Sequence, residues 1–96
     1  MCGATAGGLN RDGIAEGKET VIEGTIERDG EPITGYVRLL DSTGEFTAEV
    51  PTSATGAFRF FAAAGTWTLR ALVPGGSADR SVVATSGQVH EVRIAV

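Results

Sequence analysis

The chain contains one cysteine and one histidine, Cys2 and His90, and these side chains are the first candidates for chemistry. A cysteine thiolate can accept a sulfane sulfur and carry it as a persulfide, and basic neighbours or a helix start usually lower its pKa. Cys2 has neither, because a glycine-rich stretch without a charged residue follows it directly. We therefore keep two interpretations of Cys2 open: a sulfur acceptor on a flexible arm, or an incidental exposed thiol.

Other catalytic and ligand-binding motifs do not occur in the sequence. One cysteine and one histidine do not make the usual ligand set of a zinc site. His90 is expected on the inward side of the last strand, where backbone groups would satisfy its ring. The turn carboxylates do not form a D-x-[DN]-x-[DN]-G calcium loop, and the glycines do not form a G-x-x-x-x-G-K-[ST] phosphate loop. We therefore expect no catalytic residue, no metal and no cofactor.

Charge and hydropathy narrow the class of partner. The net charge of -4 and the isoelectric point near 4.8 disfavour nucleic acid, which is bound by clustered Lys and Arg. The basic residues are spread singly, so an anionic membrane surface is also not expected. No apolar stretch resembles a signal peptide or a membrane span, and a single cysteine suits a reducing compartment. The expected location is the cytoplasm.

Composition divides the chain once, near residue 18. Residues 1–18 hold five of the 14 glycines and few large aliphatic residues, so they predict a flexible tail that carries Cys2. Residues 19–96 show short runs of β-branched and aromatic residues separated by turn residues, which predicts a β-sandwich domain. No helix of useful length competes with this interpretation.

Alternation of apolar and polar residues predicts seven strands and the side of each strand that faces the core. The expected strands are Thr20–Arg28, Gly35–Asp41, Phe46–Val50, Ala57–Ala62, Thr66–Val73, Arg80–Ala84 and Val89–Val96. The inward face of residues 80–84 stays open, because Val82 and Val83 point opposite ways. The expected core consists of Ile22, Ile26, Val37, Leu39, Phe58, Phe60, Trp67, Leu69, Val92 and Ile94.

The order of these segments resembles a known group of folds. TGAFRF (residues 55–60) and GTWTL (residues 65–69) are similar to the hairpin and the following strand of the transthyretin-like, or prealbumin-like, sandwich, which includes carboxypeptidase regulatory-like domains. The resemblance runs from Thr20 to Val96 and implies a seven-stranded antiparallel β-sandwich. Hydrolases of this group use several histidines and a C-terminal Tyr-Arg-Gly-Ser motif, which this chain lacks, so their activity is not implied.

A second resemblance covers almost the whole chain. The chain resembles actinobacterial SseC-like proteins of unknown function in four segments: MCG at the start, KETVIEG (residues 18–24), VRLLDSTGEFTAEV (residues 37–50) and FRFFAAAGTWTLRAL (residues 58–72). Genes of that family often lie beside a thiosulfate sulfurtransferase (rhodanese) gene. The resemblance therefore implies a link to sulfur metabolism, without supplying a reaction.

Two functions are consistent with the sequence. We favour a non-enzymatic accessory protein or sulfur carrier, with Cys2 as the acceptor and a thiosulfate sulfurtransferase as the partner. The alternative is a protein- or ligand-binding sandwich in which Cys2 is incidental. Exposed sheet edges would also allow a homodimer. In the binding interpretation, four apolar residues expected on the outward face form the partner surface: Tyr36, Leu40, Phe61 and Leu72.

Overall fold

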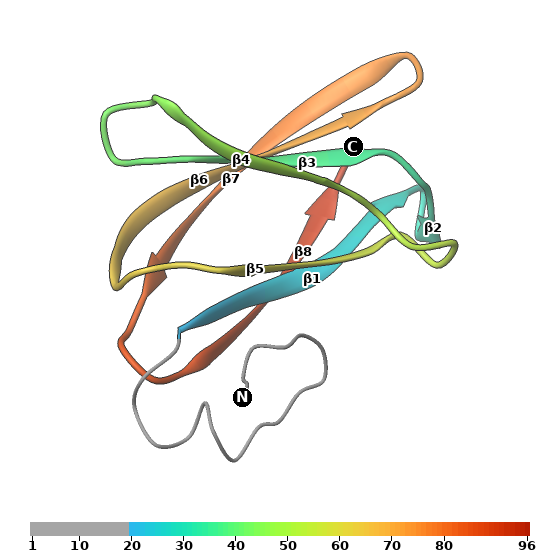
Figure 1. The fold of residues 1–96 in the computed structure, drawn as a ribbon. Coiled ribbons are helices and arrows are strands. Elements are labelled where there is room, and N and C mark those ends of the chain that lie inside the picture. The colour runs from blue at the N-terminus through green and yellow to red at the C-terminus, as the bar shows by residue number, and fades with distance from the viewer. Residues whose placement is uncertain (1–19) are drawn as a thin grey trace.

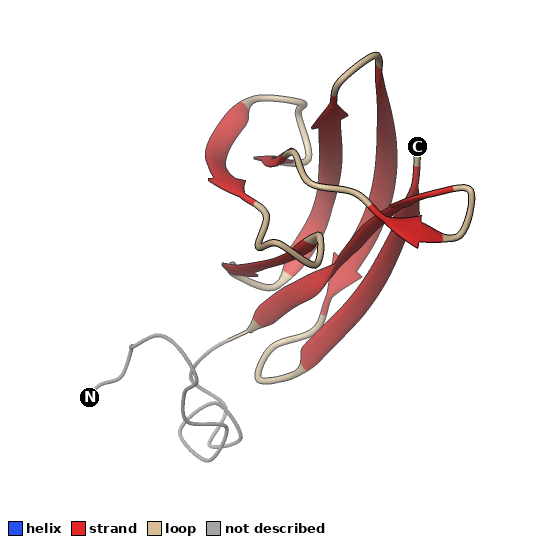
Figure 2. Ribbon diagram, turned by 90° about the vertical axis from the view of Figure 1, so that its right-hand side faces the viewer, coloured by secondary structure: helices blue, strands red, loops and turns tan. Residues whose placement is uncertain are grey.

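A computed structural model describes residues 20–96, which form two four-stranded sheets (Figure 1). The strands are β1 (Val21–Arg28), β2 (Glu31–Pro32), β3 (Tyr36–Leu40), β4 (Phe46–Pro51), β5 (Ala57–Phe61), β6 (Gly65–Val73), β7 (Gly76–Ala84) and β8 (Val89–Ala95). Figure 2 shows strands and loops, and no helix, in this described part. The predicted all-β sandwich is confirmed, while the predicted tail and Cys2 lie outside the described residues.

The two sheets differ in how their strands run. Sheet A contains β2, β1, β5 and β8, and sheet B has the order β4-β3-β6-β7. In sheet A, β1 pairs antiparallel with β5 along one side and parallel with β8 along the other. The parallel pair departs from the fully antiparallel sandwich that we expected. It arises because the chain leaves sheet B after β7 and enters sheet A beside its first strand.

Alternating side chains of both sheets meet in one core. Ile22, Ile26 and Leu69 have no accessible surface, and the rings of Phe58 and Phe60 lie 6.2 Å apart. The expected core residues are all buried except two, Trp67 and Val92, which are partly buried and pack against the cluster. The Trp67 indole lies at the rim because its Nε1 donates to the Ala63 carbonyl, 2.8 Å away.

The turn after β1 adds a short strand that we did not expect. Asp29 and Gly30 both have positive φ, 55° and 82°, which is the conformation of a tight hairpin turn whose twist matches the flanking strands. The chain therefore folds back, and Arg28 and Glu27 pair with Glu31 and Pro32. Pro32 has no N–H for the ladder, and β2 ends there after two residues.

Strand β7 is longer than the predicted Arg80–Ala84. It begins at Gly76 and pairs with β6 along its whole length, from Val73 opposite Gly76 to Gly65 opposite Ala84. Pro74 and Gly75, with φ of 80° at Gly75, suit the central positions of a hairpin turn. β6 and β7 are therefore the two strands of one hairpin, and residues 74 and 75 form its tip. The open question of its inward face is resolved, because Val82 packs against the core and Val83 is 66% exposed.

Candidate functional site

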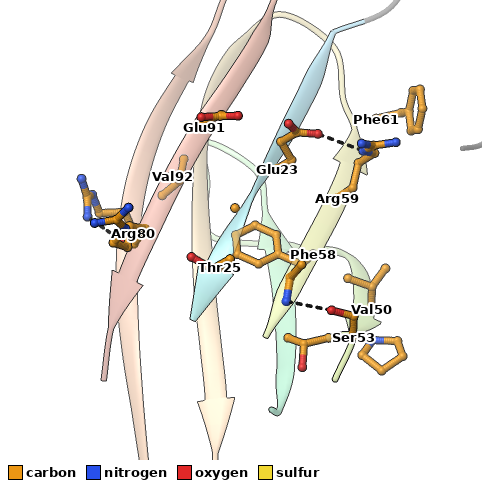
Figure 3. Close-up of a pocket in the computed structure, with 15 residues that line it drawn as sticks. Glu23, Thr25, Val50, Ser53, Phe58, Arg59, Phe61, Arg80, Glu91 and Val92 are labelled. Atoms are coloured by element: carbon orange, nitrogen blue, oxygen red, sulfur yellow. Dashed lines mark hydrogen bonds and ion pairs between the residues drawn. The ribbon is translucent and has the colours of Figure 1, made fainter. Parts of the chain in front are cut away.

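The outer face of sheet A carries an open hollow of about 1170 Å³ (Figure 3). Its floor is formed by β8, β1 and β5, which lie side by side in the figure. One rim comes from residues 50–53 at the end of β4, and Arg80 of β7 contributes to the lining as well. The outward side chains in this lining are Glu23, Thr25, Ala57, Arg59, Phe61, Glu91 and Arg93.

A row of three charged residues crosses the hollow. Arg59, Glu23 and Glu91 occupy matching register positions on β5, β1 and β8 (Figure 3). The Arg59 Nε donates to the Glu23 Oε1 at 2.9 Å, and the Arg93 Nε lies 3.0 Å from the Glu27 Oε2. Glu91 is exposed and forms no ion pair within residues 20–96. The hollow therefore presents a carboxylate that no cation in the described domain neutralises.

An apolar row lies next to the charged row. Phe61, Val21 and Val89 occupy matching positions on the same three strands. Val21 is almost fully buried at 1% exposure, whereas Phe61 keeps 41% of its surface accessible. The Phe61 ring is thus the large apolar group that a molecule entering the hollow would meet.

Arg80 closes the side of the sandwich where β7 and β8 face each other. Strand alternation puts Arg80 on the inward face of β7, between Ala78 and Val82. Its Nη1 donates to the Arg93 carbonyl at 2.6 Å and so reaches from sheet B to sheet A. An inward-pointing charge on an edge strand also discourages pairing with another chain.

The start of β1 is held firmly beside the hollow. The Thr20 Oγ1 accepts from the Gly87 N at 3.0 Å, and the Thr20 carbonyl accepts from the Ala62 N at 2.9 Å. The Val21 N donates to the Gln88 carbonyl at 3.0 Å. These bonds fix the point at which residues 1–19 join the domain, adjacent to the end of β5 that carries Phe61.

His90 has a structural position, as the sequence predicted. Its side chain lies on the inward side of β8, and its Nε2 accepts from the Thr85 backbone N at 2.8 Å. The ring therefore holds the turn between β7 and β8. Within residues 20–96, no group of three or more His, Cys, Asp or Glu side chains could hold a metal ion.

The predicted four-residue partner surface is not one surface. Tyr36 is 51% exposed and faces Leu72 across β3 and β6 on sheet B, whereas Phe61 lies on sheet A. Leu40 is only 7% exposed, so it adds almost no accessible surface to a partner surface, although its unbroken pairing with Thr68 keeps it on the same face of β3 as Tyr36. The pairing of β3 with β4 shifts register between Leu39 and Leu40, which places Phe46 opposite Leu40. Tyr36 and Leu72 can contribute to one surface, and Phe61 to another.

The outer face of sheet B has a charged row that is neutral as a whole. Glu49, Arg38, Arg70 and Asp79 occupy matching positions on its four strands. Arg38 bonds Glu49 at 2.7 Å, and Arg70 donates to both Asp79 carboxylate oxygens at 2.8 and 3.0 Å. Hydrogen bonding from Arg70 lowers the pKa of Asp79 below its ordinary value. The free carboxylate of Glu91 thus distinguishes the hollow of sheet A from this row.

The alternation along each strand puts Glu23 and Glu91 on outward faces, but it does not show that these two side chains lie close together. Their proximity depends on the parallel pairing of β1 with β8, which no local pattern encodes. The alternation of apolar and polar residues in VIEGTIER and VHEVRIA is the signal that the sequence offers. It shows which side chains of each strand point outward, but it does not show which strand lies beside which.

Comparison with known proteins places the chain in a family. Residues 2–96 match the model described as a protein of unknown function, DUF1416. The chain belongs to the DUF1416 family. Two relatives, the uncharacterized proteins Rv0814c and Rv3118 of Mycobacterium tuberculosis, are each 48% identical over 99 residues, covering 100% of this chain and 99% of their own length. An uncharacterized protein of Mycolicibacterium smegmatis is 51% identical over an alignment of 86 residues, and the match covers 88% of this chain and 96% of that protein.

Solved structures share the fold of this DUF1416 protein at low sequence identity. The major pilin subunit BcpA of Bacillus cereus matches 81% of this chain with a TM-score of 0.60 and 11% identity, and the match spans 28% of the pilin chain. A DUF3823 family protein from Parabacteroides merdae matches 81% with a TM-score of 0.56 and 16% identity, and the match spans 45% of that chain. These similarities concern the β-sandwich alone. Among residues 20–96, no helix is long and apolar enough to cross a membrane.

Proposed function

We propose that the protein is a non-enzymatic accessory protein that binds a partner protein through the hollow of sheet A. The observation that carries this proposal is the accessible Phe61 ring, 41% exposed on a rigid sheet face beside charged side chains. Aromatic anchors in such concave sites supply much of the energy of protein interfaces. The engagement of His90 with the backbone of Thr85 supports a binding role over a catalytic one.

The partner that we propose is a thiosulfate sulfurtransferase. The support is the resemblance of MCG, KETVIEG and the following segments to SseC-like proteins. The sulfurtransferase of the same organism, purified and active, is titrated into the protein by isothermal calorimetry. We expect binding that Phe61→Ser weakens at least about tenfold, the equivalent of losing one buried aromatic contact.

Phe46→Ser is the matched control for this titration. Phe46 is 59% exposed, and the ring packs under the guanidinium of Arg38 on sheet B. Phe46→Ser therefore makes the same change of side chain at a position outside the hollow. An equal loss of affinity in Phe61→Ser and Phe46→Ser would show that binding depends on exposed apolar side chains in general and not on the hollow. If the wild type gives no heat of binding, the sulfurtransferase is not the partner.

Sulfur transfer through Cys2 is a second candidate function. The family match begins at residue 2 and so includes Cys2. In the proposed step, the Cys2 thiolate attacks the outer sulfur of a sulfurtransferase persulfide, the sulfur–sulfur bond breaks, and the enzyme's cysteine leaves as a thiolate. Intact mass after incubation with sulfurtransferase and thiosulfate should rise by one sulfur atom in the wild type and not in Cys2→Ser. An unchanged wild-type mass with an active enzyme would exclude the carrier function.

We also propose four finer assignments: a transthyretin-like fold, an SseC-like family, a cytoplasmic location and a homodimer. The sandwich is transthyretin-like, which is supported by the position of TGAFRF at the start of β5 and of GTWTL at the start of β6. The chain is SseC-like and works in the cytoplasm, where a reducing environment would keep a free thiol intact. A homodimer would form through an edge strand, and sedimentation velocity tests its presence.

A further inference from the structure

We propose that the hollow of sheet A recognises a segment of a partner protein in which a Lys or Arg lies four residues from a large apolar residue. Glu91 would pair with the cation, and Phe61 would pack against the apolar side chain. This inference rests on the proposed binding function and specifies the chemistry of the partner.

The first argument is the charge balance of the hollow. Arg59 is paired with Glu23, and Arg93 with Glu27. The Arg80 guanidinium donates to a backbone carbonyl of β8. Glu91 lies directly beside Glu23 in the parallel pairing, and adjacent like charges are unfavourable. A cation from outside the domain would relieve this repulsion and complete the row.

The second argument is the spacing between the two contact groups. Phe61 and Glu91 lie two strands apart across the sheet and two residues apart along it. With strands about 4.8 Å apart and a rise of about 3.3 Å per residue, their Cβ atoms are separated by roughly 12 Å. An extended segment covers about 13 Å in four residues, and residues four apart point to the same side. One strand-like segment can therefore reach both groups.

The third argument is the charge of the whole protein. The net charge of -4 favours the approach of a basic partner over an acidic one. A partner seated in the hollow would also lie beside Thr20, through which the chain from Cys2 enters β1. The docking surface and the candidate sulfur acceptor would then serve the same complex.

The test uses isotope-labelled full-length protein and a blocked five-residue peptide with leucine first, lysine last, and serine and threonine between them. We expect amide shifts in residues 57–61, 21–25 and 89–93, and binding about two- to fivefold weaker in Glu91→Gln, as for an exposed ion pair. Phe61→Ser should also weaken binding.

Glu45→Gln is the matched control, because it removes the same charge from an exposed residue in the β3–β4 turn. The inference is wrong if Glu45→Gln and Glu91→Gln weaken the binding of the peptide equally. It is also wrong if a peptide with glutamate in place of lysine binds equally well, or if the amide shifts are confined to surfaces outside the hollow. Unchanged spectra elsewhere in each variant verify that it is folded. If the sulfurtransferase binds but the lysine peptide does not, the binding function stands and the partner chemistry proposed for the hollow is wrong.

Discussion

Substitution of Gly24 by alanine adds one methyl group to sheet A, and we expect this methyl group to destabilise the domain more than one added at any other position of the sheet. Gly24 lies in the middle of β1 opposite Val92 of β8. An added Cβ would overlap the Val92 carbonyl oxygen, and it would stand 2.8 Å from the carbonyl carbon and 3.1 Å from the Phe58 Cζ. Because ordinary Cβ contacts begin at 3.4 Å, β8 would have to retreat by at least 0.6 Å from the carbonyl carbon, and by more from its oxygen.

The expected cost is at least about 3 kcal/mol, since backbone atoms cannot rotate away as a flexible side chain can. A domain of this size has a total stability on the order of 5–10 kcal/mol, so Gly24→Ala should be close to unfolding at room temperature. Urea denaturation followed by circular dichroism measures the free energy of unfolding.

Gly76→Ala is the matched control for this measurement. Gly76 also lies in a strand, and its added Cβ would meet only the Val96 Cγ1 at 3.5 Å and the Arg28 Nη2 at 3.6 Å, which are ordinary contacts. We expect a change within about 0.5 kcal/mol of the wild type. Equal midpoints for Gly24→Ala and Gly76→Ala would refute the close approach of β1 and β8.

Three further predictions concern the core, a turn and the last hairpin. Leu69→Ala should lower the free energy of unfolding by about 2–5 kcal/mol, because Leu69 is fully buried. Val83→Ala should lower it by less than about 0.5 kcal/mol, because Val83 is exposed; urea titrations measure both changes. Hydrogen bonds from Thr43 lower the pKa of Asp41 below its ordinary value of 3.8, so the stabilisation by this carboxylate is present above that pH and is lost as the pH falls through the folded pKa. The urea midpoints of the wild type and Asp41→Asn should therefore differ at neutral pH and converge as the pH is lowered through that folded pKa. His90→Ala should speed amide exchange at Thr85, which loses its acceptor, and unchanged exchange would contradict the structural role of His90.

Much of the fold follows from local rules that the sequence displays. Alternation placed Ile22, Phe58 and Ile94 in the core correctly, because one face of each strand is buried and the other is not. The position of His90 followed from the same parity. Asp29 and Gly30 lie between the first two expected strands, and the tight geometry of this turn explains the extra pairing that the pattern alone did not reveal.

What could not be predicted depends on contacts between distant segments. The register shift between Leu39 and Leu40 is a property of how β3 and β4 pair, and it places Phe46 opposite Leu40. The Glu91 carboxylate indicates a binding site only because β8 lies beside β1 and because Arg59 forms its ion pair with Glu23. Neither contact can be read from the local sequence. Of the outward residues that line the hollow, the sequence singled out Phe61, and only the topology shows that the others lie beside it.

The parallel pairing of β1 with β8 also affects when the domain can fold. Val21 pairs with Val89, so sheet A joins opposite ends of the described domain. Such distant contacts require a large loop to close before they stabilise the chain, which slows folding. During synthesis, β1 can find β5 early, but the sheet lacks its last strand until residues 89–95 have left the ribosome. Any chain that stalls or is cut before this point would expose the edge of β1 as a template for aggregation.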